Sequence, residues 1–298
     1  MHTLPVLMAL FQINSTELTL APQSTVLFTL DCVIGSLALV LMGWTFIRWS
    51  SGKQVAAPKH QGLPNVNGGA EAIVGPLLGY MAGYSLVAFI AGIMGDAMPT
   101  NSVAPLAAGA GAHAVGAIVC LWIAATQFDG GIKAFLFGSS RLARRGDWLR
   151  MTGVLMVALA ACPVLLWLTH RLLSPFLPGL ENDVHPTIEL LRSGDAPGMM
   201  IVMLWLAAVV VAPVAEECFF RGILQNVLRT WYGHRGAAVA ATSAAFAFVH
   251  AGQPATLPAI FLLSVLLGCL YERSGNLWSP ILVHALFNAR TMLWETLS

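Results

Sequence analysis

Long stretches without charged side chains constrain this chain more than any other feature of its sequence. The stretch at residues 200–214, MIVMLWLAAVVVAPV, has no charged residue and leads almost directly into Glu216 and Glu217. A segment of about 20 apolar residues is long enough to cross the hydrocarbon core of a bilayer as a helix. We expect about eight such segments, at residues 24–49, 72–95, 105–126 and 151–170, from 198 into the two glutamates, and at 237–250, 257–271 and 277–293.

The composition agrees with a chain that lies mostly in lipid. Hydrophobic residues make up 57% of the sequence and charged residues only 10%, against about 25% charged residues in soluble domains. Because a segment in lipid must satisfy its own backbone hydrogen bonds, we expect an all-α, polytopic transmembrane helical bundle. The net charge of +1 excludes a broad basic surface for nucleic acid. The five cysteines are scattered without CxxC spacing and suggest no disulfide framework.

Basic residues alternate between the expected loops. Lys and Arg are concentrated in the first, third and fifth loops, near residues 48–59, 133–150 and 221–235, and are absent from residues 1–23 and 96–104. By the positive-inside rule the three basic loops face the cytoplasm. The first residues also lack the basic region and cleavage site of a signal peptide. We therefore expect a multi-pass integral protein of the plasma (inner) membrane, with both termini outside.

The last third of the chain places polar side chains inside apolar segments. Ionisable groups are costly in a membrane and normally face the bundle interior or a cavity. A group of such residues on neighbouring helices is hard to explain as lipid-facing, so it predicts a polar site within the bundle. The residues are Glu216, Glu217, Arg221, His250, His284 and Asn288.

The two adjacent glutamates differ in what their helix offers them. Glu217 and Arg221 are four residues apart, so they lie on one helix face and can pair. Glu216 is rotated by about 100° from Glu217 and has no such local partner. An ionised carboxylate is costly to bury without a partner, so Glu216 is suited to accept a proton from water. Glu216 is therefore the predicted general base.

The other polar residues can supply the remaining parts of a hydrolytic site. Phe246 and His250 are four residues apart, as are His284 and Asn288, so each pair shares a helix face. An imidazole beside the base could hold the attacking water, while a second imidazole and an amide are suitable donors to an oxyanion. These are the parts needed to hydrolyse an amide bond.

Each of these residues also has a purely structural interpretation. The ion pair of Glu217 can serve only to avoid an unpaired buried charge. A lone histidine at the position of His250 or His284 is more often a cap or an interhelical donor, and Asn288 alone would join two helices. His113, in the third expected segment, is interpreted as an interior histidine and receives no role. The functional interpretation rests on the combination.

Depth in the membrane sets a further condition on the site. Residues 237–250 rise only about 21 Å as a helix, so His250 meets Glu216 in one of two ways. Either the helix that carries Glu216 continues past Arg221 towards Trp231, or residues 237–250 do not cross completely. We favour the first, because GILQNVLRTW contains no proline and is typical of a helix.

Three motifs in order resemble a known family. Residues 216–221 match EExxxR, residues 246–250 match FxxxH, and residues 284–288 match HxxxN. The order and the gaps resemble the CAAX-protease and bacteriocin-processing family of intramembrane proteases, also called CPBP or ABI. Residues 275–280, GNLWSP, are similar to the lead-in that the family has before its last histidine. The resemblance covers roughly residues 198–293.

The resemblance implies an integral membrane endopeptidase that acts at or within the bilayer. By analogy with the family, Glu216 and His250 would activate the attacking water. His284 and Asn288 would stabilise the oxyanion. The expected partners are the lipid bilayer and a peptide or protein substrate near the membrane, for which a lipidated C-terminal tail is one candidate. No nucleic acid is expected.

The resemblance also divides the chain and assigns supporting residues. Residues 151–298 would form the catalytic membrane core, and residues 1–150 would be N-terminal membrane segments without a recognised motif. Glu217, Arg221 and Phe246 would support the site structurally.

We expect no metal cofactor. Zinc prefers three N, S or O ligands and a water, and Glu216, His250 and His284 could supply them as the alternative. The chain has no HExxH, however, and Asn288 is a poor zinc ligand.

Two other functions remain open at the level of sequence. The chain could be a non-catalytic scaffold, chaperone or immunity-type protein of the same fold, although a scaffold has no need of an unpaired buried glutamate. It could also be a transporter that uses the same groups as a proton relay. The sequence shows neither an inverted repeat nor paired broken helices, which such transporters commonly have.

Overall fold

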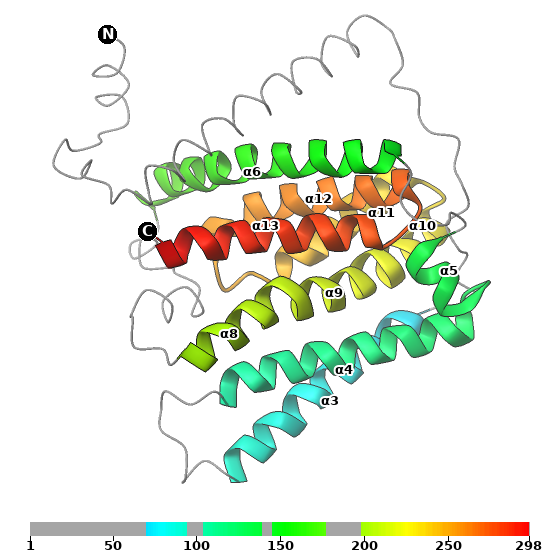
Figure 1. The fold of residues 1–298 in the computed structure, drawn as a ribbon. Coiled ribbons are helices and arrows are strands. Elements are labelled where there is room, and N and C mark those ends of the chain that lie inside the picture. Colours follow the sequence, from blue (N-terminus) through cyan, green and yellow to red (C-terminus); the bar gives the residue numbers. More distant parts are fainter. Residues whose placement is uncertain (1–69, 94–103, 139–144, 177–197, 298) are drawn as a thin grey trace, which may run out of the picture.

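The regular elements in the described part of this protein are helices. The computed structural model describes residues 70–93, 104–138, 145–176 and 198–297, and within these ranges it contains no β-strand (Figure 1). The helices outside the long central one are α3 (Glu71–Ile93), α4 (Ala104–Gln127), α5 (Gly131–Phe137), α6 (Arg145–Leu173), α11 (Arg235–Phe248), α12 (Leu257–Ser274) and α13 (Trp278–Leu297), with a short 3₁₀ turn, η5 (Pro254–Thr256), before α12. The expected all-α class is confirmed for the described residues.

One continuous helix carries the two glutamates. It runs from Gly198 to Tyr232, which is 35 residues, and consists of α8 (Gly198–Leu206), η3 (Ala207–Val211), α9 (Ala212–Glu217), η4 (Cys218–Gln225) and α10 (Asn226–Tyr232). The prediction that this helix continues past Arg221 towards Trp231 is confirmed. Glu216 lies near the middle of the helix, which places it well inside the bundle.

The elements η3 and η4 are stretches of π-helix on either side of the glutamates. Such π-bulges are rare and are often found at functional sites. In η3 the backbone N–H of Ala212 donates to the carbonyl of Ala207. The next donor in this pattern would be Pro213, which has no N–H. The carbonyl of Ala208 is therefore left without its donor from the helix.

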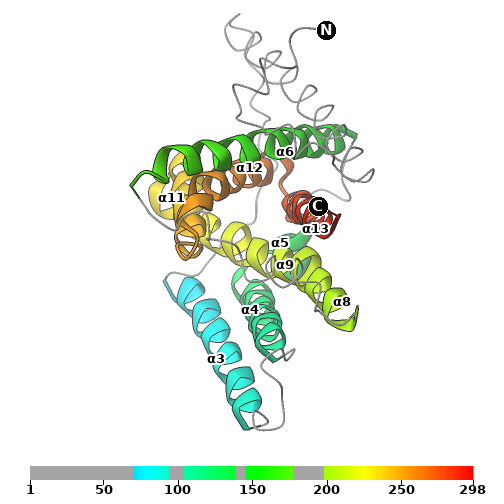
Figure 2. The ribbon, with the colours of Figure 1, turned by 90° about the vertical axis from the view of Figure 1, so that its left-hand side faces the viewer.

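The helices pack in layers around the long helix. In Figures 1 and 2, α6 covers α12 and α13 on one side, and the pair α3–α4 lies on the opposite side of the long helix. The segment around the glutamates contacts α4 on one side and α13 on the other, while α11 contacts η4. Residues far apart in the sequence therefore meet at α9.

A row of glycines allows α3 to lie close against α4. A Cβ atom at Gly79 would be 2.6 Å from Cγ2 of Val119, and one at Gly83 would be 2.9 Å from Cβ of Val115. Small residues at such contacts let two membrane helices approach closely. Gly268 likewise allows α12 to lie close to the long helix, since a Cβ there would be 2.9 Å from the side-chain oxygen of Gln225.

The short helix α11 brings His250 to the depth of Glu216. It has 14 residues, which span about 21 Å, less than the hydrocarbon core of about 30 Å. After α11 the chain turns at His250 and enters α12 through η5. Both conditions considered from the sequence thus hold: the Glu216 helix is long, and residues 237–250 are too short to cross completely.

Four stretches of the described helices are long and apolar enough to cross a membrane: Gly109–Gln127, Asp147–Leu173, Gly198–Tyr232 and Pro254–Ser274. They agree with four of the expected segments. The expected segment at 24–49 lies outside the described residues, and the total of about eight stays a prediction.

Candidate active site

An ion pair between Glu217 and Arg221 lies at the centre of the site. Nη1 of Arg221 donates to Oε1 of Glu217 at 2.7 Å, and both side chains are completely buried. The spacing of four residues predicted this pair. Because each charge would be strongly destabilising here without the other, the pair fixes this part of the helix.

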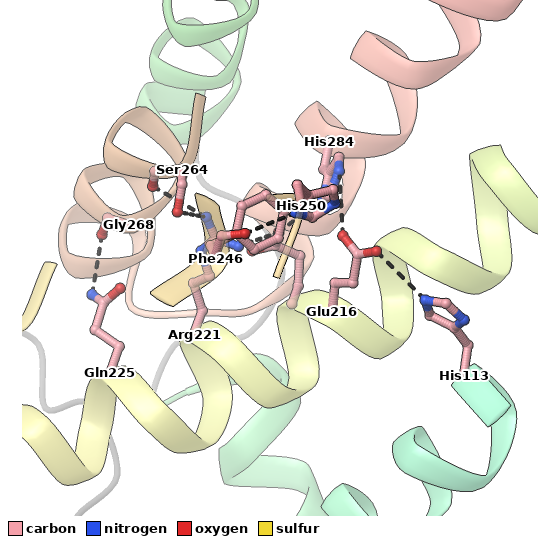
Figure 3. Close-up of polar contacts among 10 residues, drawn as sticks. His113, Glu216, Arg221, Gln225, Phe246, His250, Ser264, Gly268 and His284 are labelled. Carbon is pink, nitrogen blue, oxygen red and sulfur yellow. Dashed lines mark hydrogen bonds and ion pairs between the residues drawn. The ribbon is translucent and has the colours of Figure 1, made fainter. Parts of the chain in front are cut away.

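Arg221 is also held by two neighbouring helices. Its Nη2 donates to the hydroxyl of Ser264 at 2.8 Å and to the carbonyl of the same residue at 3.1 Å. The ring of Phe246 lies 4.9 Å from the guanidinium carbon, within the range of a cation–π contact. The arginine thus joins the long helix to α12 and α11 (Figure 3).

Glu217 has a second partner that the sequence analysis did not assign. Nδ1 of His284, on α13, lies 2.9 Å from Oε1 of Glu217. The ionised carboxylate can only accept a hydrogen bond, so Nδ1 carries the hydrogen and donates. Glu217 therefore orients His284 as well as neutralising Arg221, and the other ring nitrogen of His284 is turned away from Glu217.

Glu216 faces two histidines. Its Oε2 lies 3.8 Å from Nε2 of His284, and its Oε1 lies 3.5 Å from Nε2 of His113 on α4 (Figure 3). The Glu216 side chain is 19% exposed, in contrast to the fully buried Glu217. As expected from the sequence, these partners of Glu216 come from other helices. His113, which was interpreted as an interior histidine without a role, contacts the predicted base.

His250 lies beside the same group of residues. Its Nδ1 is 2.8 Å from the carbonyl oxygen of Phe246, and its ring centroid is 4.9 Å from that of Phe246. The Phe246 ring also lies 6.0 Å from the ring of His284. Phe246 thus contacts both imidazoles that the motifs predicted for the site, and its carbonyl fixes the ring of His250.

The three histidines share one arrangement of their ring nitrogens. In His113, His250 and His284 the Nδ1 atom lies next to an oxygen: the carbonyl of Gly109 at 2.8 Å, the carbonyl of Phe246 and the carboxylate of Glu217. Because these oxygens accept, each Nδ1 carries a hydrogen, and in the neutral ring Nε2 keeps its lone pair. Two of these Nε2 atoms face Glu216.

Asn288 lies one turn after His284 on α13 and contacts the long helix. Its Nδ2 donates to the carbonyl of Ala208 at 2.9 Å. This is the carbonyl that Pro213 leaves without a donor, so the Asn288 amide supplies the hydrogen bond that the backbone of η3 lacks. A primary amide has two N–H groups, and the second remains for another acceptor.

The structure therefore brings six of the sequence-predicted residues together, from α9, η4, α11 with the turn after it, and α13: Glu216, Glu217, Arg221, Phe246, His250 and His284. Asn288 lies on the same helix as His284, and its contact is with Ala208. Sequence analysis missed His113, the bond from His284 to Glu217, and the two π-helical stretches. His113 did carry a signal, since it is an ionisable residue within an apolar segment. A π-bulge next to Pro213 had no comparable signal.

The described residues contain no group of three or more His, Cys, Asp or Glu side chains arranged to hold a metal ion. The donor types of Glu216, His250 and His284 are suitable for zinc, but in this part of the chain they do not converge as a metal centre requires.

The same segment that holds the glutamates matches a known family. Residues 198–290 match the model of the Rce1-like family, described as type II CAAX prenyl endopeptidase Rce1-like. The match confirms the resemblance inferred from the three motifs and contains all of them. It leaves α3, α4 and α6 outside, so His113 lies outside the matched segment.

A curated relative matches over a similar length. It is an Escherichia coli protein described as an uncharacterized 24.3 kDa protein, 34% identical over 89 residues. The match covers 28% of this chain and 40% of the relative, so the two proteins are comparable over less than half of either. No solved structure matches the chain.

The central ion pair generates a prediction about stability. Replacing Arg221 by Met leaves Glu217 buried without its counter-ion, so Arg221→Met should lower the free energy of unfolding by about 3–5 kcal/mol. The matched control is Arg229→Met on the same helix, where Nη1 lies 3.9 Å from Glu272 and the side chain is partly exposed. The control should lose clearly less stability. Thermal unfolding in detergent measures both variants, and equal losses would contradict the central position of Arg221.

Proposed function

We propose that this protein is an intramembrane endopeptidase that hydrolyses a peptide bond of a membrane-associated substrate, with a water activated by Glu216. The observation that supports this proposal most directly is the difference in environment between the two glutamates. Glu217 is fully buried and bonded to Arg221 and His284, whereas Glu216 is partly exposed and faces imidazole nitrogens. A carboxylate in this situation is suited to general-base chemistry. The match of residues 198–290 to a prenyl endopeptidase family supports the same reaction.

In the proposed mechanism the attacking water lies between Glu216 and its histidine neighbours. The 3.8 Å separation between Glu216 and Nε2 of His284 is longer than a direct hydrogen bond, and polar groups at such a distance are commonly bridged by a water. Glu216, together with His250, takes a proton from this water as its oxygen attacks the carbonyl carbon. Protonated Glu216 can then deliver the proton to the leaving amine.

The proposed oxyanion donors are His284 and Asn288. His284 already uses Nδ1–H on Glu217, so it donates to an oxyanion only as the imidazolium, through Nε2–H. Asn288 would use the N–H that is not bonded to Ala208. Both donors lie on α13, so their positions relative to each other depend on one helix.

We further propose that the reaction requires no metal and that the substrate is a peptide or protein segment near the bilayer, such as a prenylated C-terminal tail. The family description supports a prenylated substrate. The basic residues at the start of α6, in α5 and in α10 lie at one end of the bundle in Figure 1, which supports a cytoplasmic position for that end in the plasma (inner) membrane.

Glu216 provides the first test. Glu216→Gln keeps the shape of the side chain but removes its basicity, so it should lower kcat by at least about 100-fold while leaving thermal stability nearly unchanged. The control is Glu272→Gln on α12, a glutamate that contacts Arg229 and Arg235 away from the site. Cleavage of a fluorogenic peptide ending in S-farnesyl cysteine and three further residues measures kcat. Full activity in Glu216→Gln would show that Glu216 is not the base, whereas a wild type that cleaves no membrane peptide would support the non-catalytic scaffold.

The contributions of Asn288 to stability and to catalysis can be measured separately. Asn288→Ala should cost about 1–3 kcal/mol of stability, because the carbonyl of Ala208 loses its donor. Pro213→Ala restores an N–H to that carbonyl, so the stability cost of Asn288→Ala should shrink in this background. The loss of kcat, about 100-fold for an oxyanion donor, should persist in both backgrounds. If Pro213→Ala also restores kcat, Asn288 acts only on the backbone.

Metal dependence has a direct test. Purified protein dialysed against EDTA and 1,10-phenanthroline should cleave the same peptide at an unchanged rate, because no step in the proposed mechanism uses a metal. Wild-type protein dialysed without chelator is the control. A loss of activity that added Zn²⁺ restores would contradict the metal-free mechanism and would support zinc on Glu216, His250 and His284.

A further inference from the structure

His113 lies on α4, outside the segment that matches the Rce1-like family, yet its ring reaches the predicted base. Nε2 of His113 is 3.5 Å from Oε1 of Glu216, and the side chains of the two residues are 23% and 19% exposed. In Figure 3 the imidazole points from α4 towards Glu216, on the side opposite to His284. A histidine that only completed the interior of its own helix would have no reason to aim Nε2 at this carboxylate.

The other ring nitrogen shows how the orientation of His113 is fixed. Nδ1 lies 2.8 Å from the carbonyl of Gly109, one turn earlier on α4. Since a carbonyl only accepts, Nδ1–H donates to Gly109, and this bond sets the rotation of the ring. When the ring is the imidazolium, Nε2–H donates to Oε1 of the ionised Glu216. This arrangement holds Oε1 and leaves Glu216 in the carboxylate form that a general base needs.

The helix α4, which carries His113, packs closely against α3 on the side away from the site. A Cβ at Gly83 of α3 would lie 3.3 Å from the Cα of Ala112, which precedes His113. On its other side α4 contacts α9 and both π-helical stretches. The close contact with α3 thus supports α4 at the level of the site, and α4 presents His113 from a fixed position.

We propose that His113 is a positioning residue of the active site, which holds Oε1 of Glu216 and thereby directs Oε2 towards His284 and the attacking water. The proposal rests on the proposed function of Glu216 and extends it to the N-terminal half of the chain. With one oxygen held from α4, the rotation of the carboxylate is restricted, and the oxygen that faces His284 is available for the water. The helix pair α3–α4 is then part of the catalytic unit and is required beyond its contribution to stability.

The test compares two substitutions of His113 in the full-length purified protein. His113→Leu removes the contact with Glu216, whereas His113→Gln keeps an N–H donor at about the distance of Nε2 from the backbone. The matched control is Thr126→Val on the same helix, where the hydroxyl bonds carbonyls of α4 itself. Activity is measured on the S-farnesyl peptide, and thermal unfolding is measured on every variant.

Misplacing a catalytic group by about 1 Å can cost about 100-fold in rate. We therefore expect His113→Leu to lower kcat by about 10- to 100-fold with little change in KM, and His113→Gln to recover most of kcat. Thr126→Val should behave as the wild type. Wild-type kcat in His113→Leu would overturn the proposal. So would a loss of activity that follows the loss of thermal stability and is equal in the Leu and Gln variants.

A second measurement needs no substrate and separates this inference from the proposed function. The melting temperatures of His113→Leu, Glu216→Leu and the double variant form a cycle. If His113 holds Glu216, the double variant should lose clearly less than the sum of the two single losses. Additive losses would overturn the inference. If the wild type does not cleave the peptide, the proposed function fails for prenylated substrates, and the cycle alone decides whether His113 holds Glu216.

Discussion

A guanidinium buried in the middle of a membrane protein must find partners, and Arg221 sets this condition for the whole site. Its partners come from three helices: Glu217 on its own helix, Ser264 on α12 and the ring of Phe246 on α11. Satisfying the arginine therefore fixes how these helices lie relative to one another. Because Glu217 also accepts from His284, the same condition extends to α13.

The two glutamates acquire different chemistry from this single constraint. Glu217 is committed to a cation and an imidazole and has no exposed surface. Glu216 precedes Glu217 and lies about 100° away from it around the helix axis, outside that network. Its neighbours are the Nε2 atoms of His113 and His284. The adjacent positions thus separate a structural carboxylate from the one that we propose as the general base. The π-helical stretches on both sides of α9 add a second constraint, since Asn288 and Asn226 donate to the carbonyls of Ala208 and Gly222 there.

Sequence reasoning predicted the contacts that lie within one helical turn and the residue types of the site. The Glu217–Arg221 pair and the long Glu216 helix follow from spacing and from the absence of proline after Arg221. The contacts of His284 with Glu217 and of His113 with Glu216 join residues that are far apart in the chain, and no local period determines them. The length of α11 also depended on where the turn at His250 falls, which composition alone did not specify.

The central claim is that His113 and His284 present their Nε2 atoms to Glu216 because the Nδ1–H of each histidine in the site is bonded to a fixed oxygen. Nitrogen-15 NMR of histidine-labelled protein tests this most directly, with His113, His250 and His284 assigned by single substitution. The account predicts a protonated Nδ1 in all three rings, and a change at His284 when Glu217 is replaced by Gln. A neutral His284 that carries its hydrogen on Nε2, and that does not respond to Glu217→Gln, would contradict it.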